Sequence, residues 1–206
     1  MPSPPTFELP LFPLQTVLFP DGLLSLKVFE ARYLDLVASC VRESTSFGVV
    51  ALKQGSEARR GSDASTVFES VGTLAELIEV DSAQAGILHV RCRGTQRFEA
   101  KSSRQESDGL WLARASTLPI DDPGAPPEAM VDTVKGLANA IATLKAQNQV
   151  PFLQPYRFDK AGWVANRWCE ILPIPLAAKQ RLLELDEPLM RLQLVDEFLR
   201  GKGVVG

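Results

Sequence analysis

The fold is decided by residues 8–33, which read ELPLFPLQTVLFPDGLLSLKVFEARY. An almost wholly apolar run in this stretch is interrupted by three prolines, Pro10, Pro13 and Pro20. Because proline lacks a backbone N–H and fixes φ, the run is predicted to form neither a continuous helix nor a central strand. We expect short extended pieces instead, of the kind that cross over or close a small β-barrel.

A turn, a strand and a helix are predicted after the last of these prolines. In Pro20-Asp21-Gly22, proline presets φ and glycine is expected to take a positive φ. Residues 23–29 follow as a strand, and Glu30 leads into a helix over about 31–43. The helix is predicted to place four side chains on one stripe: Tyr33, Val37, Cys40 and Val41.

The segment from residue 47 to residue 116 has the period of two that half-buried strands show. The predicted strands are 47–52, 71–80, 87–93 and 110–116. Gly, Ser and charged residues predict a mobile hairpin loop over 54–65, and a turn is expected over 81–86. In the clearest strand, 87–93, the side chains on one face are Leu88, Val90 and Cys92, which we expect to point inward. The outward face has His89, Arg91 and Arg93.

A cluster of Asp, Pro and Gly over 121–127 marks a boundary, after which the period changes from 2 to 3.6. We therefore predict two domains, a β-rich one over 1–122 and a helical one over 123–206. The first predicted helix has Met130, Val134, Leu137, Ile141 and Leu144 on one face. The other three are a helix capped by Asp159 that buries Ala161, Val164, Ala165, Trp168 and Cys169, a helix over 176–185, and a helix over 189–200 capped by Gly201.

The composition is that of an ordinary soluble globular protein. The 206 residues are 45% hydrophobic and 23% charged, and the net charge of −3 gives no general attraction to nucleic acid or anionic membrane. No apolar run is long enough to span a bilayer, and no secretory signal is visible. Three distant cysteines, Cys40, Cys92 and Cys169, fit reduced structural thiols. We therefore expect a cytoplasmic protein without a membrane partner.

The sequence shows no arrangement of residues that is typical of a catalytic or a metal site. One histidine and three isolated cysteines do not supply a zinc site. Cys92 lies three residues from His89 on the same predicted strand and points to the opposite face, so the two cannot act as a nucleophile and its base. No phosphate-binding Gly-x-x-x-x-Gly-Lys-Ser/Thr loop is present. We expect no enzymatic activity and no cofactor.

Several blocks resemble the N-terminal, substrate-binding domain of Lon-type ATP-dependent proteases. The family pattern is roughly Pro-Leu-Phe-Pro-Leu, then Val-Leu-Phe-Pro-Gly, then Pro-Leu-x-Ile-Phe-Glu-x-Arg-Tyr. Here Asp21 precedes the glycine, Ser25 stands where proline is usual, and Val28 replaces isoleucine. The similarity continues in family order through 47–50, 71–76, 93–98, 163–167 and 183–186.

The resemblance implies an α+β fold, namely a PUA-like β pseudo-barrel followed by a C-terminal bundle of about four helices. It also implies a polypeptide-recognition module whose partners are polypeptide segments or protein clients, including a separate AAA+ ATPase or protease. The ATPase and peptidase modules of full-length Lon do not fit in this chain. A peptidase is therefore the least favoured alternative.

Three groups of residues are candidates for a partner-binding surface. Glu30, Arg32 and Tyr33 match the family's Phe-Glu-x-Arg-Tyr block, and they either bind a partner or fix the helix on the barrel. Trp163 and Trp168 lie about 140° apart on a helix, so either one is partly exposed for binding or both are buried. The third group is a basic stripe: His89, Arg91, Arg93, Arg97, Lys101 and Arg104.

The basic stripe has two readings. It is either an anion-binding surface or a solvated strand face with protective charges. Because PUA-like barrels are also used on RNA, the 89–104 segment motivates an RNA-binding alternative. The net negative charge opposes it, so a nucleic-acid partner is not expected.

Overall fold

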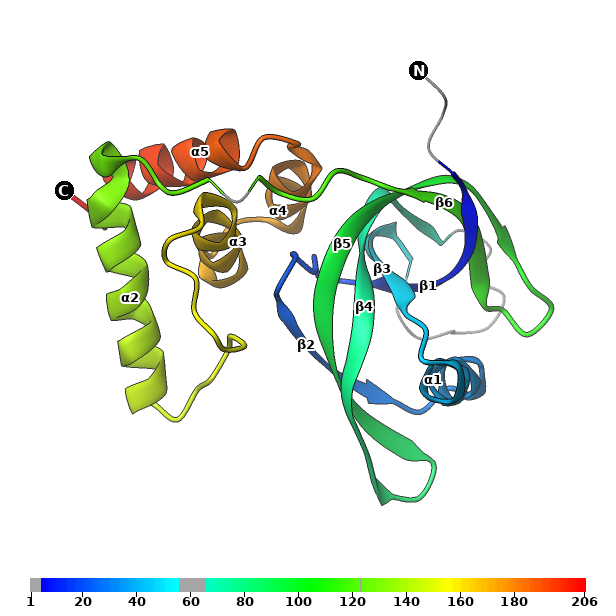
Figure 1. Cartoon of the computed structure of the whole chain (residues 1–206). Helices are drawn as coiled ribbons and strands as arrows, with labels where there is room; N and C mark the ends of the chain where they lie inside the picture. Colours follow the sequence, from blue (N-terminus) through cyan, green and yellow to red (C-terminus); the bar gives the residue numbers. More distant parts are fainter. Residues whose placement is uncertain (1–4, 56–65, 123) are drawn as a thin grey trace. The chain divides into compact units, whose positions relative to one another are not determined.

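The computed structural model describes residues 5–55, 66–122 and 124–206. The chain divides into two compact units, Met1–Pro119 and Ile120–Gly206 (Figure 1). Most of the hairpin loop predicted over 54–65 lies outside the described residues.

The first unit is built on a six-stranded sheet that closes on itself. The strand order is β2-β5-β4-β3-β1-β6, and β6 also pairs with β5 (Figure 1). Five strands therefore form a closed ring, and β2 pairs with the first half of β5, along the edge that β6 occupies farther along the strand. The mixed α+β fold predicted from the sequence is confirmed. The elements of this unit are β1 (Phe7–Leu14), β2 (Leu23–Val28), α1 (Ala31–Glu43), β3 (Phe47–Gln54), β4 (Val67–Gln84), β5 (Ile87–Gln105) and β6 (Trp111–Thr117).

The prolines do not keep β1 out of the centre of the sheet, so that prediction is wrong. Residues 7–11 of β1 pair with β6, and residues 11–14 pair with β3. The two ladders overlap only at Leu11. Pro10 therefore pairs only with β6 and Pro13 only with β3. Each proline has one side without a strand partner among the described residues, and the missing N–H is tolerated on that side.

The turn at residues 19–22 forms as predicted, but aspartate takes the positive φ. Asp21 has φ 60°, and the Gly22 N–H donates to the Phe19 carbonyl over 2.9 Å. The Gly94 N–H in turn donates to the Gly22 carbonyl over 2.9 Å. This bond fixes the register at which β2 joins β5.

Helix α1 packs on the barrel through an apolar stripe. Tyr33, Leu36, Val37 and Cys40 are buried, whereas Val41 is 56% exposed. The prediction that Val41 belongs to the stripe is wrong, because Leu36 lies on the buried face instead. The stripe joins a core cluster with side chains from the strands, among them Phe12, Val28, Phe47, Val90 and Cys92.

Strands β4 and β5 form one long hairpin with a tight turn. Both strands extend farther than predicted, so the turn takes Ala85-Gly86 rather than 81–86. The predicted alternation in residues 87–93 is confirmed, with Val90 and Cys92 buried and His89, Arg91 and Arg93 exposed.

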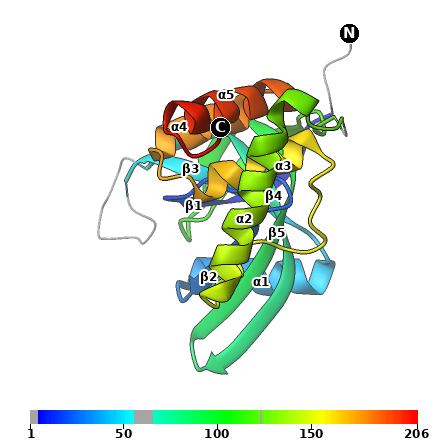
Figure 2. The ribbon, with the colours of Figure 1, turned by 90° about the vertical axis from the view of Figure 1, so that its left-hand side faces the viewer.

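The second unit has four α-helices, as predicted, preceded by a short 3₁₀ turn over Glu128–Met130. Every residue of α3 from Ala161 to Cys169 is buried, because α3 lies among the other helices of this unit (Figures 1 and 2). Asp159 is not its cap: the helix follows Lys160, with no side-chain capping bond. The helices are α2 (Val131–Ala146), α3 (Ala161–Ile171), α4 (Leu176–Glu184) and α5 (Pro188–Gly201).

The faces of α2 and α5 differ in detail from the sequence pattern. On α2 the buried residues are Thr133, Leu137 and Ile141, so a polar side chain was missed. Thr133 hydroxyl donates to the Asp196 carboxylate on α5, and its carbonyl accepts from Trp168 over 3.0 Å. Gly201 is the last residue of α5 rather than its cap, and the positive φ falls on Gly203, at 67°.

Candidate functional site

One edge of β2 has no strand partner in the described part of the chain, because β2 pairs only with β5. The ladder is regular from Leu23 opposite Arg93 to Val28 opposite Leu88. An antiparallel ladder alternates hydrogen-bonded and non-hydrogen-bonded pairs. The Gly94 N–H donates to the Gly22 carbonyl, so Gly22 and Gly94 form a hydrogen-bonded pair. The next pair, Leu23 and Arg93, is therefore a non-hydrogen-bonded one. The backbone N–H and C=O groups of Ser25 and Lys27 therefore face the open edge.

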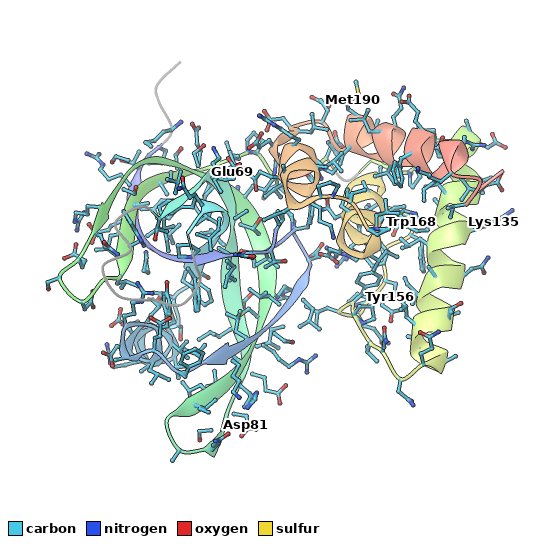
Figure 3. All side chains as sticks on the ribbon, turned by 180° about the vertical axis from the view of Figure 1, so that it is seen from behind. Glu69, Asp81, Lys135, Tyr156, Trp168 and Met190 are labelled. Atoms are coloured by element: carbon cyan, nitrogen blue, oxygen red, sulfur yellow. The ribbon has the colours of Figure 1, made fainter. Side chains whose placement is uncertain are left out.

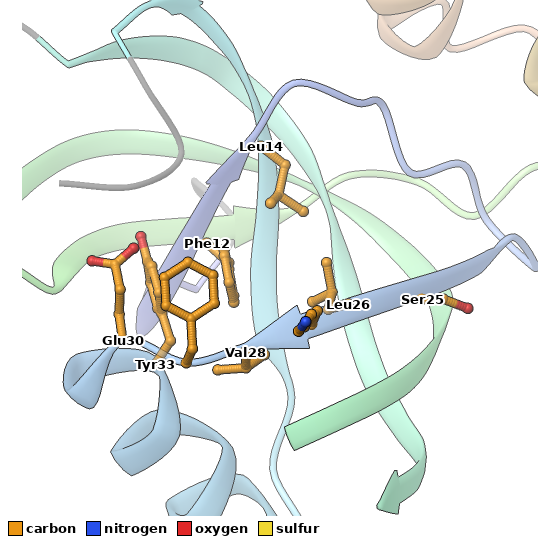
Figure 4. A pocket seen from close by; sticks show the side chains of 9 residues that line it. Phe12, Leu14, Ser25, Leu26, Val28, Glu30 and Tyr33 are labelled. Carbon is orange, nitrogen blue, oxygen red and sulfur yellow. The ribbon is translucent and has the colours of Figure 1, made fainter. Parts of the chain in front are cut away.

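A pocket of about 270 Å³ lies beside this edge. Side chains of β1 and of β2 lie on either side of it, as the labelled Phe12, Leu14, Leu26 and Val28 show in Figure 4. The lining is completed by Ser25, Lys27, Phe29, Glu30 and Tyr33. The pairing of β1 with β6 ends at Leu11, so no described strand pairs with this side of β1 beyond that residue. The pocket lies between this part of β1 and the open edge of β2.

The start of α1 makes the rigid wall of the pocket. Tyr33 is 4% exposed, and its ring stacks on Phe12 with centroids 3.8 Å apart. The guanidinium group of Arg32 lies over the Tyr33 ring, 4.5 Å from the ring centroid. It also forms an ion pair with Glu30 at 2.9 Å and donates to the Gly109 carbonyl over 2.7 Å. These contacts correspond to the structural reading of Glu30, Arg32 and Tyr33, in which they fix the helix on the barrel.

The rim of the pocket is accessible. Phe29 is 56% exposed, which is unusual for a phenylalanine, and Ser25 and Lys27 are also exposed. Burying the Phe29 ring against a partner would remove a large apolar surface from water, and such burial is favourable at about 25 cal/mol per Å². The pocket thus combines an apolar floor, an exposed aromatic ring and backbone groups that face an edge with no strand partner among the described residues.

Four of the cations in the basic stripe are paired with carboxylates. Arg91 lies 2.9 Å from Glu79, and Arg93 lies 3.1 Å from Glu76. Lys101 is paired with Glu99, and Arg104 is paired with both Glu8 and Glu106. These exposed pairs add little stability, but each one cancels a positive charge on the face predicted to attract anions. The geometry therefore fits a solvated strand face with protective charges better than it fits an anion-binding surface.

Arg97 does not belong to the exposed stripe, so its predicted position is wrong. It is 1% exposed. Between Ala75 opposite Gly94 and Thr73 opposite Arg97, β5 contains one residue more than β4. Such a bulge reverses the side to which later side chains point, and it turns Arg97 inward.

Both tryptophans of α3 are buried, so the second of the two readings holds. Trp163 is 5% exposed and Trp168 is 4% exposed. Trp163 packs against the rings of Phe158 and Tyr156, at 5.4 and 5.9 Å between centroids. Figure 3 labels Trp168 and Tyr156 on this unit. The angular separation on the helix did not imply exposure, because Tyr156 and Phe158 pack on Trp163 while Trp168 packs against α2.

No cluster that could hold a metal ion is found in the described ranges 5–55, 66–122 and 124–206. In these ranges, no three His, Cys, Asp or Glu side chains lie where they could hold a metal ion. Burial raises the pKa of Cys92 and of Cys169 to about 12, and it raises the pKa of Cys40 as well, so all three thiols are protonated at neutral pH. None of the helices described is both long and apolar enough to cross a membrane.

Comparisons with known proteins place the chain in one family. Residues 8–201 match the family described as the ATP-dependent protease La (LON) substrate-binding domain, and the chain belongs to this family. It is 28% identical over 205 residues to a Lon protease of Anaeromyxobacter dehalogenans, a match that covers 94% of this chain and 23% of the relative. It is 25% identical over 200 residues to Lon protease 2 of Myxococcus xanthus, covering 94% of this chain and 24% of the relative. The chain thus spans about a quarter of the length of these proteases.

Solved structures agree with this assignment. A crystal structure of a Lon N-terminal domain protein from Xanthomonas campestris is 31% identical, with a TM-score of 0.75 and coverage of 92% of this chain and 96% of that one. The N-terminal domain of the Mycobacterium avium complex Lon protease has a TM-score of 0.63 at 16% identity, and the match covers 94% of this chain and 98% of that one. The second similarity shows the fold alone.

Proposed function

We propose that this chain binds polypeptide segments of other proteins at the pocket between β1 and β2, without a catalytic step of its own. The observation that carries the proposal is the apolar pocket beside a strand edge that pairs with no other described strand. A polypeptide can satisfy both features at once, because it brings apolar side chains and unpaired N–H and C=O groups. The family, described as a substrate-binding domain, supports the same function.

The size of the pocket suggests modest affinity. About 270 Å³ accommodates one or two side chains rather than a folded surface. We expect dissociation constants of about 1 μM, or roughly −8 kcal/mol, for unfolded segments. Such weak binding suits clients that must be released, for example to a separate AAA+ ATPase or protease. A cytoplasmic setting, in which the three buried thiols stay reduced, is part of the same proposal.

Truncation of the exposed ring at the pocket rim is expected to weaken polypeptide binding. Phe29→Ser removes an apolar side chain that lines the pocket and is 56% exposed, so the fold should be retained. Loss of about 60–80 Å² of buried apolar surface corresponds to roughly 1.5–2 kcal/mol, or at least a tenfold rise in Kd. The measurement is fluorescence anisotropy of dye-labelled, permanently unfolded carboxymethylated casein titrated with the protein.

The double variant Arg91→Gln/Arg93→Gln is the matched control. It changes two exposed side chains of the same unit, which lie on the face formerly predicted to bind. We expect its affinity to match the wild type within a factor of about two. Loss of binding in this variant and not in Phe29→Ser would move the site to the basic stripe. Hydrolysis of the casein by the pure protein would contradict the non-catalytic part of the proposal.

A further inference from the structure

The side chains of β2 alternate between the interior and the solvent. Leu24, Leu26 and Val28 pack on the core cluster of the barrel, whereas Ser25 and Lys27 are exposed. A strand added to the open edge would continue this alternation, because neighbouring strands in a sheet share their pleat. A residue placed opposite Lys27 would therefore point to the solvent side, and its two neighbours would point toward the pocket.

The solvent side of this edge has an uncompensated positive charge. Among residues 5–55, 66–122 and 124–206, no carboxylate lies within ion-pair distance of Lys27, in contrast to Arg91 and Arg93 on β5. The residue paired with Lys27 on β5 is His89, which offers no negative charge at neutral pH. Opposite charges that face each other across two strands stabilise the pair. The edge thus favours an acidic residue in the incoming strand.

The pocket side of the same edge is apolar. Its floor is made by Phe12 and Leu14 of β1 and by Leu26 and Val28 of β2 (Figure 4). The one acidic side chain of the lining, Glu30, is held by Arg32 at 2.9 Å. The two residues that flank the acidic position would therefore be bound best when they are large and apolar.

We propose that the ligand is an extended segment with the pattern apolar–acidic–apolar, which adds to β2 as a further strand. This inference rests on the proposed function and deepens it by naming the class of segment. The N–H and C=O groups of Ser25 and Lys27 hydrogen-bond the ligand backbone. The ammonium group of Lys27 pairs with the acidic side chain, and the pocket receives the apolar ones.

Three nine-residue peptides, labelled with fluorescein and identical outside a central triplet, test this inference by anisotropy. Their triplets are Leu-Glu-Phe, Leu-Lys-Phe and Ser-Glu-Ser. We expect wild-type protein to bind Leu-Glu-Phe about threefold tighter than Leu-Lys-Phe. It should bind Leu-Glu-Phe at least tenfold tighter than Ser-Glu-Ser, because two apolar side chains are lost from the pocket.

Two variants separate strand addition from simple apolar binding. Ser25→Pro removes an N–H from the open edge and leaves the ladder to β5 intact, since proline is tolerated at such positions. Loss of one backbone hydrogen bond should weaken Leu-Glu-Phe binding by about five- to tenfold. Lys27→Glu should reverse the order of affinities, so that Leu-Lys-Phe binds more tightly than Leu-Glu-Phe. This substitution leaves Ser25 and the pocket floor unchanged.

The outcomes distinguish this inference from the proposed function. If unfolded casein binds in a Phe29-dependent way but neither the charge of the triplet nor the Ser25→Pro change alters peptide affinity, strand addition is refuted and the proposed function stands. If Phe29→Ser binds casein as the wild type does, the proposed function itself fails. Retained preference for Leu-Glu-Phe in Lys27→Glu would refute the role of Lys27.

Discussion

Replacing Gly94 with alanine is expected to destabilise the first unit by about 3 kcal/mol. A Cβ atom at this position would lie well inside contact distance of the Phe19 carbonyl oxygen, and 3.0 Å from Cγ of Leu18. Because the nearest atom belongs to the backbone, the turn at 19–22 must move. Overpacking of this kind costs about 1–3 kcal/mol, and weakening the Gly94 to Gly22 hydrogen bond adds about 0.5–1.5 kcal/mol.

Urea unfolding monitored by far-UV circular dichroism measures this effect. Gly201→Ala is the matched control, because nothing lies within 4 Å of the added Cβ and alanine favours the helix. We expect the control to be neutral or stabilising by up to about 1 kcal/mol. A Gly94→Ala protein as stable as the wild type would show that the turn does not hold β2 as described.

Replacing Arg191 with methionine is expected to destabilise the second unit by about 3–5 kcal/mol, because it breaks a buried ion pair. The Arg191 side chain is fully buried. It donates to Asp121 over 2.7 Å, to Asn166 over 2.7 Å, and to the carbonyls of Leu182 and Leu185 over 2.9 and 2.7 Å. Methionine fills similar space but leaves these acceptors, including a carboxylate, without their donor.

Arg181→Met is the control for this change. Arg181 also pairs with a glutamate, Glu184 at 3.1 Å, but its side chain is 84% exposed. Exposed pairs contribute about 0–1 kcal/mol, so the control should unfold close to the wild type. Urea titration followed by tryptophan emission is suited to both variants, since Trp163 and Trp168 are buried in this unit. Equal stability of the two variants would contradict the assigned role of the Arg191 network.

Much of the fold could be predicted because it follows from the local periodicity of apolar residues and from the proline and glycine residues that mark turns and boundaries. The helix over 31–43 and the inward face of 87–93 were read correctly, since apolar spacing reports directly which side is buried. What failed depends on long-range pairing. The prolines of β1 are accommodated only because its two ladders are staggered, and a bulge turns Arg97 inward. Neither event has a local signature.

The candidate site was only partly visible in the sequence. The block around Glu30, Arg32 and Tyr33 was recognised, and the structure places it at the wall of the pocket. Phe12 and Leu14 were not predicted to line a pocket, because nothing in a sequence shows which strand edge stays open. The alternation of Ser25 and Lys27 with Leu24, Leu26 and Val28 was the available signal. The charge of the basic stripe was a misleading signal, since the glutamates that pair with Arg91 and Arg93 lie on another strand.

Amide hydrogen exchange of β2, measured by NMR with and without saturating carboxymethylated casein, tests the central claim most directly. In the free protein, the amides of Leu24, Leu26 and Val28 should exchange slowly, and those of Ser25 and Lys27 should exchange fast. Bound polypeptide is predicted to slow the Ser25 and Lys27 amides at least tenfold. Unchanged exchange at these two amides, with protection appearing elsewhere in the chain, would contradict binding at the open edge of β2.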